Sequence, residues 1–145
     1  MTLPDADRSE YLADEAATLA FGRSLLALLD GAPLVFLRGQ LGAGKTTLVR
    51  GILRAWGYSG SVKSPTYTLL EPYEVDGRTI YHFDLYRIGD SEELDFIGID
   101  ELMDADAIKF VEWPELGSGR LPDPDVDIRI SLEGEGRRIE VSVKP

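Results

Sequence analysis

The sequence predicts an α/β fold with a mixed parallel and antiparallel sheet. Residues 33–37, PLVFL, form a short apolar run typical of a strand buried on both faces. Residues 125–132 and 137–143 alternate apolar and polar side chains around GEG, which is typical of a hairpin with one face toward water. Because no internal repeat, low-complexity tract or linker interrupts the chain, we expect a single domain over residues 1–145.

The composition excludes several kinds of site. The chain has no cysteine and one histidine, His82, so disulfides, thiolate metal sites and histidine-rich zinc sites are excluded. The net charge of −11 opposes binding to nucleic acid by a general electrostatic surface, so any RNA contact must be local or made through a partner. No secretion signal or apolar run of roughly 20 residues is present, and we expect a soluble, cytoplasmic protein without a membrane contact.

The first half of the chain predicts a helix, a strand and a second helix. Residues 14–30 have leucines near helical spacing, with Asp14 as the N-cap. The buried strand at 33–37 runs directly into a glycine-rich loop. Residues 45–56 then form an amphipathic helix that ends at Gly57. A glycine loop between a strand and a helix is the context that a phosphate-binding loop requires.

The middle of the chain predicts a hairpin, a helix start and a further strand. Residues 66–73 and 79–84 are extended segments joined through the Asp-Gly turn at 76–77. Asp90, with a glutamate three residues later, is typical of a capped helix start. Residues 107–113, AIKFVEW, predict another strand, so the sheet combines parallel and antiparallel pairs.

The loop GQLGAGKTT, from Gly39 to Thr47, matches the phosphate-loop pattern G-x-x-x-x-G-K-[ST] through Gly39, Gly44, Lys45 and Thr46. Glycines let the backbone turn its N–H groups toward phosphate oxygens, and the following helix adds its positive N-terminal end. The lysine reaches the β- and γ-phosphates, and the threonine hydroxyl binds magnesium. The motif predicts a P-loop NTPase-like, three-layer fold.

A phosphate loop also needs an acidic residue at the end of a neighbouring strand. Asp84 ends YHFD and Glu112 ends IKFVE, and the pattern does not rank the two. The chain contains no asparagine, which excludes the Asn-Lys-x-Asp guanine-reading element and makes ATP the expected nucleotide. The only glutamine, Gln40, lies inside the loop, so we expect slow hydrolysis by the isolated chain.

Several stretches together resemble the bacterial TsaE family, formerly YjeE, the ATPases of tRNA threonylcarbamoyladenosine synthesis. They are GQLGAGKTTLVRGIL, VKSPTYTLLEPY, YHFDLYRI and VEWPELGSGRLP, in this order and spacing. A phosphate loop alone is widespread, whereas SPTYTL, HFDLYR and VEWPE together are specific. The sequence departs from the family pattern at Gln40, where an acidic residue is usual.

The resemblance implies a protein that binds ATP and magnesium and docks on the TsaB–TsaD pair. That pair transfers a threonylcarbamoyl group to adenosine 37 of tRNAs reading ANN codons, and the ATPase enables its repeated turnover. Contact with tRNA is then indirect, through the complex, and hydrolysis depends on the partners. Nothing in the sequence requires self-association, although the pattern permits it.

The resemblance also implies roles for particular residues. Thr46 and Glu112 would hold magnesium, and Asp84 would position or activate water. Ser64 and Thr66 occupy the place of a segment whose hydroxyls sense the γ-phosphate. The remaining nucleotide contacts would come from Glu15, Gly42, Ala43, Gly44, Lys45, Thr46, Thr47 and Arg137.

We do not assign a catalytic role to two aromatic residues in these motifs, Trp113 and His82. Trp113 follows Glu112 in the matched motif and is equally compatible with packing and with an interface. His82 alternates with Phe83 along its strand, and we interpret it as structural.

Two other functions compete with the partner-activated ATPase. A small-molecule P-loop kinase needs an acceptor pocket and an arginine-bearing lid, but the segment after the loop helix predicts strands rather than a helical lid. A nucleotide-binding scaffold without essential hydrolysis is opposed only by the two strand-end acids, Asp84 and Glu112.

Overall fold

Parallel strands form the centre of a seven-stranded sheet whose order is β1-β7-β6-β2-β5-β4-β3. The computed structural model describes residues 7–63, 65 and 69–144. The parallel pairs are β2 with β5, β2 with β6, and β4 with β5. Antiparallel strands extend both edges. The strands are β1 (Arg8–Leu12), β2 (Leu34–Arg38), β3 (Leu70–Val75), β4 (Arg78–Asp84), β5 (Ile108–Glu112), β6 (Val126–Glu133) and β7 (Gly136–Val143).

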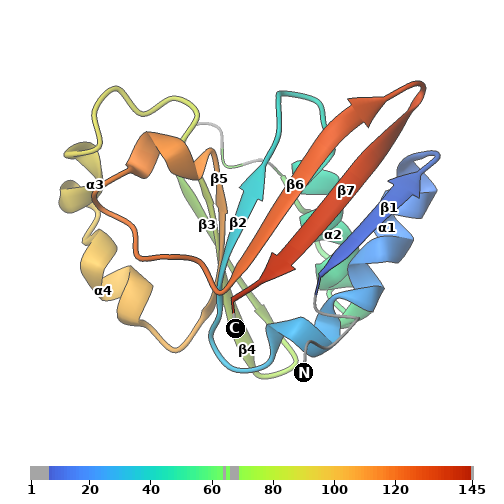
Figure 1. Cartoon of the computed structure of the whole chain (residues 1–145). Coiled ribbons are helices and arrows are strands. Elements are labelled where there is room, and N and C mark those ends of the chain that lie inside the picture. The colour runs from blue at the N-terminus through green and yellow to red at the C-terminus, as the bar shows by residue number, and fades with distance from the viewer. Residues whose placement is uncertain (1–6, 64, 66–68, 145) are drawn as a thin grey trace.

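Helices lie on both faces of this sheet, which gives the predicted three-layer α/β architecture (Figure 1). On one face α1 and α2 pack together, and α3 and α4 lie on the other. The helices are α1 (Glu15–Ser24), α2 (Lys45–Ala55), α3 (Glu93–Phe96) and α4 (Ile99–Asp104), with short 3-10 turns at η1 (Leu26–Leu29) and η2 (Pro114–Gly117).

The central strand β2 explains how one chain builds two apolar layers. Val35 and Leu37 belong to the core beneath α1 and α2, whereas Leu34 and Phe36 belong to the core beneath α3 and α4. Successive strand side chains point to opposite faces, so a continuous apolar run is the pattern that a doubly covered strand needs. The glycine-rich loop therefore follows a strand that is anchored on both faces.

Helices α1 and α2 cross at very short distance because glycines occupy the crossing. A Cβ atom on Gly51 would lie 2.4 Å from the Leu19 carbonyl oxygen, and one on Gly22 would lie 2.8 Å from the Ile52 nitrogen. Only hydrogen atoms fit in this space. The crossing holds α2, and with it the end of the glycine loop, against the sheet.

The structure corrects two element boundaries. The helix predicted over residues 14–30 ends at Ser24 and continues as a 3-10 turn. The Ser24 hydroxyl donates to the Phe21 carbonyl, a local bond that competes with the α-helical pattern. The strand predicted over 66–73 is described as Leu70–Val75, and residues 66–68 lie outside the described part of the chain.

The helix start predicted at Asp90 is instead a turn closed by the bond from the Glu93 N–H to the Asp90 carbonyl, and α3 begins at Glu93. The Glu93 carboxylate accepts from the backbone N–H groups of Gly89 and Asp90, as in a capping box. The strand β1 and the helix α4 were not predicted from the sequence. Across residues 7–63, 65 and 69–144, no helix is both long enough and apolar enough to cross a membrane.

Candidate functional site

The glycine loop between β2 and α2 has a backbone that only glycine adopts easily at three positions. The φ angles of Gly39, Gly42 and Gly44 are 151°, 78° and 107°. A Cβ on Gly39 would also lie 2.4 Å from the Ile130 carbonyl oxygen of β6. The loop therefore fits tightly against the sheet, as a phosphate-binding turn at a helix N-terminus does. Between these glycines, Ala43 is fully buried.

Lys45 is the first residue of α2 and is 4% exposed. Its ammonium donates to the Gly39 carbonyl, lies 4.0 Å from Glu112 Oε1 and lies 4.1 Å from the centre of the Trp113 ring. Burial lowers the pKa of Lys45, and the neighbouring carboxylates, first Glu112, oppose this effect. The loop thus holds a desolvated positive charge at its mouth, where phosphate oxygens would compete with these contacts.

Thr46, the next residue of α2, contacts the end of β5. Its hydroxyl donates to Glu112 Oε2 at 3.0 Å, so the hydroxyl lone pairs stay available to a cation. The same carboxylate oxygen lies 2.6 Å from His82 Nε2, and Glu112 is 3% exposed. A hydroxyl beside a carboxylate is a donor set that fits magnesium.

The described residues contain no group of three or more His, Cys, Asp or Glu side chains around one point. Magnesium bound here would need further oxygens from phosphate and water, which is its usual manner of binding. Thr46 and Glu112 therefore fit a nucleotide-associated magnesium ion rather than a metal held by protein ligands alone.

Asp84 lies beside Glu112 because the parallel register pairs the two residues at the ends of β4 and β5. The side chain of Asp84 accepts from the Tyr86 backbone N–H at 3.0 Å, and the residue is 7% exposed. A cavity of about 350 Å³ lies over these strand ends and is lined by residues that include Lys45, Thr46, Asp84, Glu112 and Trp113. Both acids left unranked by the sequence thus lie at the same cavity as the loop.

Arg137 contacts the glycine loop from the opposite side. Its guanidinium donates to the Ala43 carbonyl at 3.0 Å and to the Gly42 carbonyl at 3.1 Å. These bonds draw two loop carbonyls toward β7. The predicted nucleotide residue is therefore, in this structure, a clamp on the loop backbone.

A second cavity of about 230 Å³ lies on the Arg137 side of the loop, and Glu15 and Thr47 also line it. Glu15 is exposed and lies 3.5 Å from the half-buried Arg50 in an ion pair. Thr47, Gly42 and Gly44 line both cavities, so both cavities border the glycine loop. The predicted residues Glu15 and Arg137 are brought together here.

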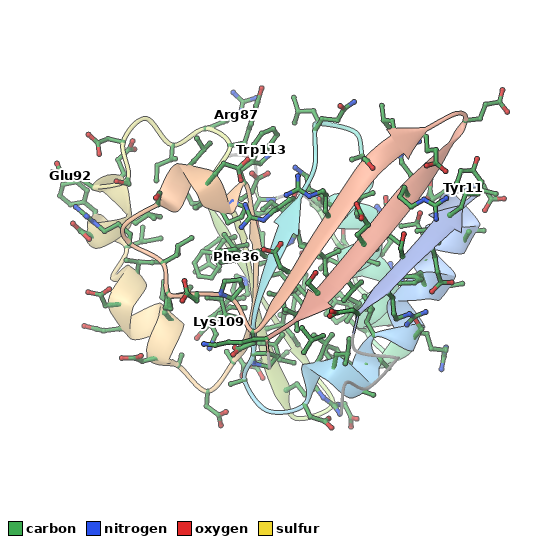
Figure 2. All side chains as sticks on the ribbon, in the orientation of Figure 1. Tyr11, Phe36, Arg87, Glu92, Lys109 and Trp113 are labelled. Carbon is green, nitrogen blue, oxygen red and sulfur yellow. The ribbon has the colours of Figure 1, made fainter. Side chains whose placement is uncertain are left out.

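Ser64 and Thr66 lie outside the described residues, so their predicted roles stay predictions. Sequence reasoning did not find the contact of Trp113 with Lys45 or that of His82 with Glu112. Trp113 also packs on Tyr86, at 5.0 Å between ring centres. Arg87 and Trp113 lie at one end of the sheet, and Lys109 lies at the other (Figure 2). The sequence signal that could have identified Trp113 and His82 is their position: Trp113 follows Glu112, and His82 lies two residues before Asp84.

Comparison with known proteins gives a consistent result. The family model described as "Threonylcarbamoyl adenosine biosynthesis protein TsaE" matches residues 12–139. The tRNA threonylcarbamoyladenosine biosynthesis protein TsaE of Haemophilus influenzae is 46% identical over 138 residues, covering 92% of this chain and 87% of the relative. The protein of the same name from Treponema pallidum is 35% identical over 127 residues, covering 87% and 92%.

A solved structure shares the fold as well. The crystal structure of Bacillus subtilis YdiB superposes with a TM-score of 0.78 at 26% identity, covering 95% of this chain and 86% of that one. The family match spans the glycine loop, both strand-end acids and Arg137. The chain belongs to the TsaE family of threonylcarbamoyl adenosine biosynthesis proteins.

Proposed function

We propose that this chain is a magnesium-dependent ATPase that acts with TsaB and TsaD in tRNA threonylcarbamoyladenosine synthesis in the cytoplasm. In this proposal, hydrolysis enables repeated turnover of the TsaB–TsaD transferase, which modifies adenosine 37 of tRNAs reading ANN codons. The observation that carries the proposal is the convergence of Lys45, Thr46 and Glu112 at the mouth of the glycine loop. Family membership supplies the biological setting.

The loop would hold the phosphates through backbone N–H groups and the lysine. Arg137 binds the carbonyls of Gly42 and Ala43, which fixes the orientation of the neighbouring peptide groups. Lys45 would exchange its contacts with the Gly39 carbonyl and the Trp113 ring for phosphate oxygens. Because Lys45 is almost fully buried, its charge acts in a poorly screened environment, where it stabilises developing negative charge strongly.

Thr46 and Glu112 would hold the magnesium ion through the hydroxyl lone pairs and the carboxylate. When bound, magnesium neutralises charge on the phosphate oxygens. Asp84 would accept a hydrogen bond from the attacking water, because it lines the same cavity one strand away from Glu112. These assignments use each carboxylate for one task.

The open side of the cavity supports activation by a partner. Leu41, which lines the cavity, is 60% exposed, and Tyr86, which also lines it, is 41% exposed. Water reaches a site with such walls, and excluding water strengthens the electrostatic interactions of phosphoryl transfer. A protein seated on Leu41 and Tyr86 would cover the reacting phosphate. The isolated chain is then expected to hydrolyse ATP slowly.

The first experiment measures ATP hydrolysis by the purified chain with magnesium, alone and after addition of TsaB and TsaD. We expect weak activity alone and a strong rise with the partners, lost in Lys45→Ala. Unchanged hydrolysis in Lys45→Ala would refute the assignment of the loop. Phosphoryl transfer to a small acceptor would instead indicate a kinase, and full tRNA modification by Asp84→Ala would indicate a scaffold.

A further inference from the structure

We propose that His82 is a positioning residue that orients Glu112 for magnesium. The inference rests on the proposed function, because it concerns the nucleotide-associated metal. His82 is the only histidine of the chain, and it lies in β4 between Ile80 and Asp84 on one face of the strand. The ring is completely buried. It does not line the cavity over the strand ends.

The contact between His82 and Glu112 joins the centre of β4 to the end of β5. Nε2 lies 2.6 Å from Glu112 Oε2, within the range of a strong hydrogen bond. A carboxylate accepts hydrogen bonds and donates none, so Nε2 carries the hydrogen. Glu112 Oε2 accepts a second hydrogen bond, from the Thr46 hydroxyl at 3.0 Å. One oxygen of the carboxylate is thereby fixed by two donors from different elements.

The second ring nitrogen of His82, Nδ1, indicates that packing alone does not account for a histidine at this position. Nδ1 is buried and has no hydrogen-bond partner among the described residues. A buried nitrogen without a partner costs stability, and an apolar side chain of similar size would avoid that cost. The contact with Glu112 is therefore the specific interaction that His82 provides at this position.

Fixing Oε2 also controls the second carboxylate oxygen. Rotation about the last side-chain bond of a glutamate is weakly restricted, so an unheld carboxylate samples many orientations. Glu112 Oε1 lies 4.0 Å from the Lys45 ammonium, which is longer than a direct hydrogen bond. Without His82, only the Thr46 hydroxyl holds Oε2 among the described contacts, and the carboxylate can rotate away from this orientation. That rotation would turn the carboxylate away from the metal.

The test compares variants of His82 in the full-length chain. His82→Leu removes the donor, His82→Gln places an amide N–H at a similar distance, and His82→Asn carries an amide that is too short to reach Glu112. Tyr81→Phe is the matched control, since Tyr81 is the preceding residue and belongs to the opposite core layer. Circular dichroism and thermal unfolding establish that each variant is folded.

The readout is ADP affinity by calorimetry, in EDTA and over a magnesium titration. Outer-sphere partners of metal ligands typically change metal affinity by about 10- to 100-fold. We expect His82→Leu and His82→Asn to raise the magnesium midpoint by at least about tenfold. We expect His82→Gln and Tyr81→Phe to stay near wild type, and ADP affinity in EDTA to change little in all variants.

The outcomes separate this inference from the proposed function. A wild-type magnesium midpoint in both His82→Leu and His82→Asn would overturn the role of His82. If His82→Leu does not fold, equal midpoints for His82→Gln and His82→Asn would overturn it. A wild-type chain that binds no ADP with or without magnesium would overturn the proposed function itself.

A second readout uses nitrogen-15 spectra of the imidazole, which are assigned without mutagenesis because the chain has one histidine. We expect the tautomer with hydrogen on Nε2. A ring with hydrogen only on Nδ1 would contradict the contact.

Discussion

Replacing Gly39 with alanine tests whether the loop depends on its close contact with β6. The new methyl group would lie 2.4 Å from the Ile130 carbonyl oxygen, at a φ of 151°. Backbone strain in such a region costs about 1–3 kcal/mol. Overpacking against a rigid neighbour costs about 1–3 kcal/mol more. At about 3 °C per kcal/mol for a chain of this size, the two effects lower Tm by about 6–18 °C.

The matched control is Gly31→Ala, because Gly31 has a φ of 82° and a methyl group added there would have no atom within 4 Å. That variant carries the backbone cost alone, about 1–2 kcal/mol, or a fall in Tm of about 3–6 °C. Thermal unfolding followed by circular dichroism without nucleotide measures both. If Gly39→Ala has the same Tm as Gly31→Ala, the close contact with β6 does not contribute to the loss of stability, and the reasoning is refuted.

Three further predictions concern buried cations and the loop. Lys109 is 3% exposed and donates to the carbonyls of three residues, so Lys109→Met should lower the unfolding free energy by about 2–3 kcal/mol. Burial lowers the pKa of Lys109 below 10.5, so the unfolded chain holds that proton more tightly than the folded chain does. The unfolding free energy of the wild type should therefore rise relative to that of Lys109→Met as the pH increases toward 10.5. Urea unfolding of both proteins over this pH range measures the difference. In a Trp56→Phe background, ADP should change Trp113 fluorescence as Lys45 leaves the ring, and Lys45→Ala should abolish the change. Arg137→Leu should weaken ADP binding about tenfold by calorimetry, and an unchanged affinity would contradict the clamp.

Local signals predicted the parts of the fold and site that lie close together in sequence. The loop, its flanking strand and helix, and the terminal hairpin were read from short patterns, and the structure contains each of them. The ends of β4 and β5 gave two acidic candidates, Asp84 and Glu112, and the parallel register places them side by side. Their position identified these two residues, because each stands at the end of a predicted strand.

Contacts between distant segments were not predicted from the sequence. The strand β1 has one buried residue, Leu12, so it lacks the alternation that signals a strand, and it forms by backbone pairing with β7. The bond from Arg137 to Ala43 spans 94 residues. The contact of His82 with Glu112 can be predicted only when the register of β4 and β5 is known. Such contacts depend on sheet order, and no local pattern contains that information.

The clamp from β7 onto the glycine loop has a consequence for synthesis of the protein. A nascent chain that has released β2, the loop and α2 already holds Lys45 and Thr46, but it lacks the β6 carbonyl beneath Gly39 and the guanidinium of Arg137. Contacts between distant segments form late in folding because loop closure must precede them. The growing polypeptide on the ribosome would therefore complete the geometry of the glycine loop only after its final hairpin, β6 and β7, has emerged.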